Sequence, residues 1–450
     1  MLYHFFHFLL EGRHYAYENP LFRGALAGMF CFLVILLAAP RVIRELVRLK
    51  VGDIPEFDHA KLNELMKDKS NVPTMGGMMI LAAILAGIAL FADVLNFYVQ
   101  MGVLCLLWLG VLGLIDDWFK LTRKRRGGSR DGLKSYEKLL FQFGLGMILG
   151  YFVYSTGSPP TAEGERGRQG EGETAEAGLL ASDRDADPEA VGRDRVLDEN
   201  GEWGTSSWQN REPTSEEVGH PAADRPLSPS PALPLSDGVG HPSDASRVLT
   251  VPFYKPGLVL GPLAFMFIAL LVISFTSNAV NFTDGMDGLA SGCVAICSLV
   301  FMLLAYVAGD SELAVKLLVP HVPRSGELAV ICGAVMGACL GFLWYNCHPA
   351  RVFMGDTGSL PLGGVIGFVA IVIRQELMLL IVGGVFVIEA LSVILQVGYF
   401  KYTGGKRLLR CAPIHHHYQL SGWTETQIVT RFWLAAAMFA VFALATVKLR

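Results

Sequence analysis

Charged residues are scarce along most of this chain. Asp, Glu, Lys and Arg make up 17% of its 450 residues, whereas 52% are hydrophobic. Soluble proteins of this length rarely combine these two proportions. The hydrophobic residues also form runs long enough to cross a lipid bilayer. The scarcity of charge argues against a soluble fold and predicts an all-α integral membrane protein.

Three other signals are missing. None of the eight cysteines forms a CxxC pair, and Cys293 and Cys297 are flanked by Ala, Val and Ile, so we interpret them as packing residues rather than a disulfide or metal site. No internal repeat is visible. No cleavable signal peptide is evident, because Arg41, Arg44 and Arg48 follow the first apolar run. That order indicates a retained span whose C-terminal end lies inside the cell.

The apolar runs predict about ten transmembrane helices. They lie near residues 22–43, 75–96, 98–115, 137–156, 257–279, 288–308, 327–345, 359–373, 377–399 and 429–447. Lysine and arginine collect in the loops after the first, third and ninth runs, while the short loops after even-numbered runs have almost none. The positive-inside rule therefore places the odd-numbered loops in the cytoplasm and both termini in the periplasm of a bacterial inner membrane.

The stretch 157–250 differs from the rest of the chain. Between Ser155 and Thr250 about nineteen acidic residues face eight arginines, and lysine is absent. Few large apolar residues are present, so burial cannot offset the ordering entropy and we expect a disordered periplasmic insert. A partner-binding role for this insert stays open. The expected organisation is one functional membrane domain, residues 1–156 and 251–450, interrupted by the insert.

Polar residues gather in five clusters at the borders of the apolar runs. All five follow odd-numbered runs, so they are expected on the cytoplasmic face and in one active-site cleft. They are residues 69–77, Asp116-Asp117, 281–288, 353–359 and His415-His416-His417.

The acidic clusters have the chemistry of a magnesium and phosphate site. Asp116 and Asp117 end an apolar run, where carboxylates are costly and are functional candidates. Asp284 and Asp287 are three residues apart and would share a face on one helical turn. Hard oxygen ligands of this kind suit Mg²⁺. The alternatives are acids that merely end a helix and a turn rich in Asp and Gly.

The remaining clusters supply groups that bind anions. Asp356 lies in a small-residue turn that opens a helix, where free N–H groups can meet an anion and the carboxylate can hold a metal. Phe353 beside it can stack on a base or anchor the chain at the interface. The three histidines can contact phosphate or act as acid or base, because consecutive histidines cannot all bind one metal. Positive charge comes from Lys69, Lys120 and Lys138.

Taken together, the clusters resemble those of the polyprenyl-phosphate N-acetylhexosamine-1-phosphate transferases. The motifs agree in order and spacing over essentially the whole chain except 157–250, and the last one is most similar to the branch that acts on phospho-N-acetylmuramoyl-pentapeptide. Two departures are the insert and Gln419, which stands where that branch usually has an acid. The matching strings are PTMGG at 73–77, GLIDDW at 113–118, NAVNFTDGMDGLA at 278–290, FMGDTGSL at 353–360 and GGKRLLRCAPIHHH at 404–417.

The resemblance implies Mg²⁺ as cofactor and two substrates, UDP-MurNAc-pentapeptide and undecaprenyl phosphate, which would give lipid I and UMP. The bilayer is the implied surrounding, no nucleic acid is implied, and a homodimer is left open. Mapped by motif, the catalytic residues would be Asp116, Asp117, Asp356 and His415, and the metal ligands Asp356 and Asp284. The substrate-binding residues would be Lys69, Thr74, Lys120, Lys138, Asn281, Asp284, Phe353, Gly355 and His416.

Two other functions fit parts of the pattern. A sibling enzyme that uses UDP-GlcNAc would share most motifs and differ in its donor. A secondary transporter would also have many spans with acidic residues, but transporters usually place these near the membrane midplane and often show repeated halves. An assay of transfer from a labelled donor separates the three.

Cysteine-accessibility labelling tests the predicted topology. A membrane-impermeant reagent outside intact cells should reach a probe near residue 200, because the insert is expected in the periplasm. It should miss a probe near residue 125, since that basic loop is expected in the cytoplasm. The opposite labelling pattern would invert the topology and move the polar clusters to the other face.

Overall fold

The computed structural model describes residues 16–49, 69, 72–125, 132–156, 196–197, 203–204, 248–252 and 258–447. The chain divides into two units, one made of Met1–Ser158 with Gly240–Arg450 and the other of Pro159–Val239. The described part of the second unit is an antiparallel pair, β1 (Val196–Leu197) and β2 (Trp203–Gly204). Most of the stretch 157–250, for which disorder is expected, lies outside the described residues. At its end β3 (Val248–Leu249) pairs with β4 (Leu258–Val259).

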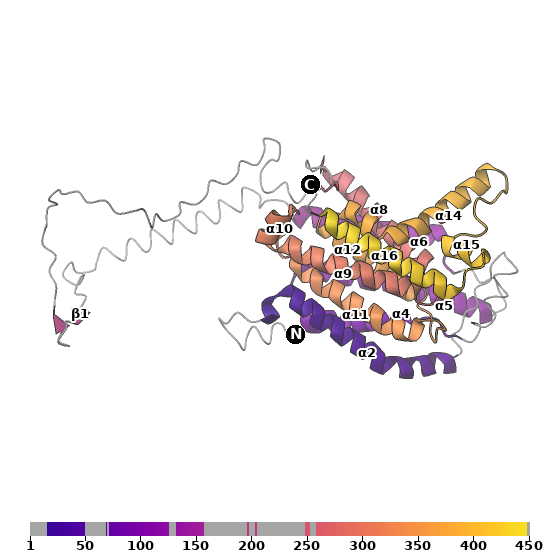
Figure 1. Cartoon of the computed structure of the whole chain (residues 1–450), viewed down its shortest axis with the longest axis horizontal. Coiled ribbons are helices and arrows are strands. Elements are labelled where there is room, and N and C mark those ends of the chain that lie inside the picture. The colour runs from indigo at the N-terminus through magenta and orange to yellow at the C-terminus, as the bar shows by residue number, and fades with distance from the viewer. Residues whose placement is uncertain are drawn as a thin grey trace. The chain divides into compact units, whose positions relative to one another are not determined.

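Helices build the first unit (Figure 1). In chain order they are η1 (Ala16–Glu18), α2 (Pro20–Arg48), α4 (Gly77–Phe91), α5 (Phe97–Arg125), α6 (Ser135–Thr156), α8 (Pro262–Thr283), α9 (Leu289–Gly309), α10 (Ser311–Leu317), η5 (Ser325–Glu327), α11 (Leu328–Asn346), α12 (Asp356–Val372), α13 (Glu376–Val382), α14 (Gly384–Tyr402), α15 (Ile414–Leu420) and α16 (Glu425–Thr446).

The predicted class, an all-α membrane protein, is confirmed. Within the described residues, eight helices are long and apolar enough to span a membrane, and α4 and α12 are shorter apolar helices, so the count of ten spans is not confirmed. The predicted single span 377–399 is wrong, because the chain breaks at Gly383 into the short α13 and the longer α14. The predicted end of a span at residue 115 is also wrong, since α5 continues to Arg125 and places Asp116 inside the helix.

Small residues let α2 and α11 pack closely. Gly24 and Gly28 on α2 face Gly333 and Gly337 on α11, where an added Cβ on Gly333 would lie 2.1 Å from the Gly24 carbonyl oxygen. Between apolar helices in lipid, such spacing of small residues allows the backbones to approach and gain dispersion energy. The two helices are therefore held by shape rather than by exclusion of water.

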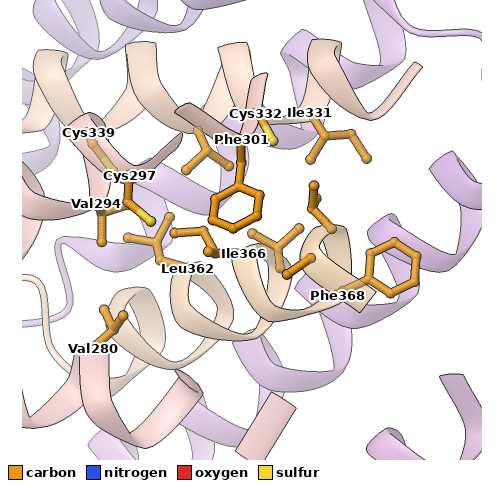
Figure 2. Packing of buried hydrophobic residues seen from close by; sticks show 14 of the residues in the cluster. Val280, Val294, Cys297, Phe301, Ile331, Cys332, Cys339, Leu362, Ile366 and Phe368 are labelled. Carbon is orange, nitrogen blue, oxygen red and sulfur yellow. The ribbon is translucent and has the colours of Figure 1, made fainter. Parts of the chain in front are cut away.

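Helix α12 forms the centre of the packing. All of its residues from Asp356 to Val372 are buried, and it packs against α5 and α8. Figure 2 shows Leu362 and Ile366 of α12 among buried side chains that include Phe301 of α9 and Ile331 of α11. The eight cysteines are free and six are buried, in agreement with a packing role. A helix enclosed in this way gives its N-terminal residue, Asp356, a fixed position.

Helix α5 touches the start of α12 without a side chain between them. A Cβ on Gly113 would lie 2.2 Å from the carbonyl oxygen of Asp356. The following turn of α5 therefore carries Asp116 and Asp117 directly to the first turn of α12. The glycine of the GLIDDW string is needed for this approach.

The substitution Gly113→Ala tests the close contact. The added methyl group meets backbone, which cannot move aside, so we expect a loss of about 1–3 kcal/mol of stability and at least a tenfold loss of activity. The matched control is Gly144→Ala on α6, where an added Cβ meets no atom within 4 Å. Thermal unfolding in detergent and product formation are the measurements, and wild-type values for both in Gly113→Ala would refute the close approach.

The second unit allows a deletion test. Replacing residues 160–239 by a short Gly/Ser linker keeps β3 and β4 and should leave activity within a few-fold of wild type, because loop length changes closure entropy only slightly. Product formation by the purified protein is the measurement. An inactive deletion protein with a normal unfolding temperature would show that the insert has a catalytic or assembly role.

Candidate functional site

A cavity of about 370 Å³ lies where the five polar clusters meet. Figure 1 shows α14, α15 and the end of α5 together at one end of the bundle. The structure brings all the predicted site residues to this place. Asp116 and Lys138 lie behind the wall, in ion pairs with residues that line it. The wall itself contains Lys69, Thr74, Asp117, Lys120, Asn281, Asp284, Phe353, Gly355, Asp356, His415 and His416.

Backbone hydrogen bonds join the PTMGG and FMGD strings into one wall. The N–H of Phe353 donates to the carbonyl of Pro73 at 2.8 Å, and the N–H of Gly76 donates to the carbonyl of Phe353 at 2.9 Å. The N–H of Gly77 then donates to the carbonyl of Met354, also at 2.9 Å. These bonds hold Thr74 and Phe353 at the cavity and explain why the two strings belong to one site.

Asp117 caps the start of α12. Its carboxylate accepts the N–H groups of Asp356 at 3.2 Å and Thr357 at 3.0 Å, and the Thr357 hydroxyl at 2.7 Å. A carboxylate is favourable there because it satisfies free N–H groups at the positive end of the helix. Gly355 has φ +72°, and a Cβ on it would lie 2.7 Å from Asp117 Oδ2. The sequence showed Asp117 as a functional candidate but gave no sign of this capping contact.

Asp116 and Asp356 share two lysines. Lys120 Nζ lies 2.7 Å from Asp116 Oδ2 and 3.2 Å from Asp356 Oδ1. Lys138 Nζ lies 2.8 Å from Asp116 Oδ2 and 2.7 Å from Asp356 Oδ2. The N–H of Leu133 donates to Asp116 Oδ1 at 2.7 Å. The site thus combines anionic ligands and cationic donors in a buried place, where their interactions are stronger than in water.

The cluster 281–288 contributes from a turn rather than from a helix. Helix α8 ends at Thr283 and α9 begins at Leu289, so the expectation that Asp284 and Asp287 share a helical face is wrong. The Asn281 amide donates to Asp356 Oδ1 at 2.8 Å. Burial raises the pKa of Asp284, and the charges of Asp356 and Asp117 raise it further.

These acids fit a divalent cation. Oxygens of Asp116, Asp117 and Asp356 lie within 4.8 Å of one another. Both oxygens of Asp117 accept N–H groups, and those of Asp356 meet the Asn281 amide and the two lysines. Asp356 and the nearby Asp284 line the same cavity. A shared cation would remove the repulsion that raises the pKa of Asp284. The oxygen ligands are the kind that Mg²⁺ prefers.

A second group surrounds Lys69 on another side of the cavity. Lys69 Nζ lies 2.6 Å from Glu425 Oε1 and is also paired with Asp287. His348 Nδ1 lies 3.0 Å from Asp287 Oδ2. Sequence reasoning missed both His348, which follows the apolar run 327–345, and Glu425, which precedes the run 429–447.

The three histidines point to different partners, as expected from their adjacency. His416 Nδ1 lies 3.2 Å from Gln419 Oε1. Burial, together with the nearby His415 and Lys69, lowers the pKa of His416 to about 3, so this ring is neutral. Gln419 thus has a partner inside the histidine motif.

The other two histidines have different partners. His417 Nδ1 accepts the N–H of Arg410. His415 lies beside Glu389 of α14, with 3.0 Å between His415 Nδ1 and Glu389 Oε2. Glu389 was missed, although an acid inside an apolar run was a visible signal.

Relatives of known name match nearly the whole chain. A phospho-N-acetylmuramoyl-pentapeptide-transferase of Desulfotalea psychrophila is 37% identical over 426 residues, which cover 94% of this chain and 92% of that protein. The chain belongs to this transferase family. Proteins of the same name from Desulforapulum autotrophicum and Oleidesulfovibrio alaskensis are 36% and 35% identical, and they cover 95% and 100% of this chain and 94% and 100% of their own lengths.

A family model described as Glycosyl transferase family 4 matches residues 241–374. This range contains Asn281, Asp284 and Asp356, which are the acidic and amide part of the site. Lys69, Lys120 and Lys138, the Asp116-Asp117 pair and the histidines lie outside this range. The similarity to the transferases over nearly the whole chain therefore covers both the site residues inside this range and those outside it.

Proposed function

We propose that this chain transfers phospho-MurNAc-pentapeptide from UDP-MurNAc-pentapeptide to undecaprenyl phosphate, giving lipid I and UMP. The observation that carries the proposal is the relation, over nearly the full chain, to proteins named phospho-N-acetylmuramoyl-pentapeptide-transferase. The cavity supports it independently, because it combines carboxylates, lysines, an aromatic ring and a histidine in a volume of about 370 Å³. Ligand pockets usually measure roughly 300–1,000 Å³.

The reaction requires that two anions meet. An oxygen of the lipid phosphate attacks the β-phosphorus of the donor, and the bond to the bridging oxygen breaks with its electron pair on UMP. Such transfers depend on positioning and on charge neutralisation rather than on covalent chemistry of the protein. Lys120 and Lys138 supply positive charge beside Asp356, and Lys69 supplies it on the other side of the cavity.

The metal would neutralise the diphosphate. Asp356 and Asp284 would hold a Mg²⁺ ion, which when bound supplies a Lewis acid for phosphate oxygens. Phe353, half-buried in the wall, presents an aromatic face to a base, and Lys69 lies 5.9 Å from its ring centre. Asp117 then has a positioning role, because its contacts fix the turn that carries Asp356.

An apolar groove supports a lipid substrate. A second cavity of about 360 Å³ lies between α8 and the α13–α14 pair and is lined almost entirely by apolar side chains such as Leu271, Phe275 and Leu379. It follows α8 as far as Ala279, half a turn before Asn281 of the polar cavity. A polyprenyl chain in this groove would place its phosphate near the acids.

The membrane orientation completes the proposal. The basic odd-numbered loops put the polar cavity on the cytoplasmic face, where a soluble nucleotide donor is available, and put both termini in the periplasm. The division into two membrane segments, 1–156 and 251–450, with an insert between them, also stays a prediction, as does a homodimer.

A donor-choice assay tests the function. Detergent-purified protein with Mg²⁺ and undecaprenyl phosphate should release UMP from UDP-MurNAc-pentapeptide and form a lipid-linked product. UDP-GlcNAc should give no product. Turnover of UDP-GlcNAc alone would assign the chain to the sibling activity, and no turnover of either donor by folded protein would remove the proposal.

Substitutions of two acids separate their roles. Asp356→Asn should lose Mg²⁺ dependence and about a thousandfold in kcat, which corresponds to roughly 4 kcal/mol of electrostatic stabilisation. Asp116→Asn should still bind donor and Mg²⁺ but turn over slowly, because Asp116 positions the lysines rather than the metal. The measurements are kcat, donor affinity and Mg²⁺ titration.

The pH response of Asp116→Asn decides between positioning and proton abstraction. The second pKa of a phosphate monoester is about 6, so the lipid phosphate is largely dianionic at neutral pH and needs no base. We therefore expect a rate deficit that does not change with pH. A deficit that disappears as pH rises would make Asp116 a general base, and normal Mg²⁺-dependent turnover of Asp356→Asn would move the metal assignment to Asp284.

A further inference from the structure

A buried carboxylate and a buried imidazole meet below the polar cavity. Glu389 of α14 and His415 of α15 both have a side-chain exposure of 0%, and His415 Nδ1 lies 3.0 Å from Glu389 Oε2. The distance is short enough for an ion pair, although the two atoms do not form a hydrogen bond in this geometry. Because α14 is one of the apolar helices that can span the membrane, an acid in it is costly without a partner.

The other nitrogen of the ring lies against Gly285, which lines the cavity together with His415. A Cβ on Gly285 would lie 2.3 Å from His415 Nε2. Within the part of the chain that the structure describes, Nε2 has no hydrogen-bond partner, although it is fully buried. A buried polar atom normally has a partner, so this nitrogen points to a group that a ligand brings.

We propose that Glu389 is a positioning residue that acts through His415. The carboxylate beside Nδ1 holds the ring in place and balances a positive charge on it, so that a ring with protons on both nitrogens directs Nε2–H toward the cavity. Nε2–H then donates a hydrogen bond to a phosphate oxygen of the nucleotide diphosphate. This inference rests on the proposed function for the identity of the ligand, and on the geometry of the pair for the role of Glu389.

The surroundings of the pair contain few other charges. His416 stands beside His415, with ring centres 4.2 Å apart, and its pKa is lowered so that it stays neutral. Cys293 of α9 lies within electrostatic range of Glu389, and Lys69, Asp284 and Asp287 line the same cavity. Among the ion pairs of the described residues, Glu389 is the carboxylate that His415 contacts.

The test removes the charge and keeps the shape. Glu389→Gln should bind UDP about tenfold more weakly than wild type, because the neutral amide no longer balances the charge of the ring that meets the diphosphate. The value of kcat/KM should fall by at least the same factor. Calorimetry with UDP and Mg²⁺ on the full-length protein in detergent gives the affinities.

A double-mutant cycle shows whether Glu389 acts through the histidine. His415→Asn alone should weaken UDP binding, and adding Glu389→Gln should weaken it no further, because the ring that the carboxylate serves is already gone. Additive losses would assign Glu389 to structure alone and overturn the inference.

Controls separate a local effect from misfolding and from failure of the proposed function. Ser392 lies one turn along α14 from Glu389, and its hydroxyl donates to the Glu389 backbone carbonyl. The Ser392→Ala protein should bind UDP as wild type does. Unfolding temperature is recorded for each variant. If wild type binds UDP but forms no product, the proposed function fails while the binding cycle still decides the role of Glu389. Wild-type affinity in Glu389→Gln would overturn the inference.

Discussion

The contact between Asp117 and the first turn of α12 is the constraint on which the site depends. One carboxylate of α5 accepts two backbone N–H groups and a hydroxyl of α12, and Gly113 lets the two helices come close enough for this. The start of α12 is thereby fixed, and with it Asp356. Since α12 is buried along its whole length, it cannot shift without disturbing the core.

The site resolves a problem of charge. Several carboxylates share a small buried space, and their repulsion would disfavour ionisation without compensation. In the structure Lys120 and Lys138 provide that compensation by bridging Asp116 and Asp356. The same cations and acids can receive a diphosphate and a metal, so the groups that stabilise the folded site are those that the proposed reaction uses. The arrangement is preorganised in the sense that little must move when charge arrives.

Helix ends, rather than helix centres, carry the polar groups. The C-terminal end of α8, the N-terminal ends of α12 and α16 and the short α15 all reach the cavity. This position is consistent with an enzyme that takes one substrate from water and the other from lipid, because the apolar groove beside α8 approaches the same place. Asp116, Asp117 and Glu389 are exceptions, since their carboxylates lie within helices, and Glu389 is paired with His415.

The sequence by itself determined the membrane class, the helical fold and the residues of the cavity. Those properties follow from local patterns: apolar runs long enough to span a bilayer, and polar strings at their borders, such as Asp116-Asp117 and the 353–359 turn. The break at Gly383, the extension of α5 to Arg125 and the separate directions of Asp284 and Asp287 could not be predicted, because each depends on what packs against the segment. Only the tertiary structure decided which acid caps a helix, which acids share lysines and which histidine has a carboxylate behind it. The contacts of Asp117, Lys120 and Lys138 with the start of α12 join residues more than two hundred positions apart, and no periodicity in the sequence records such distances.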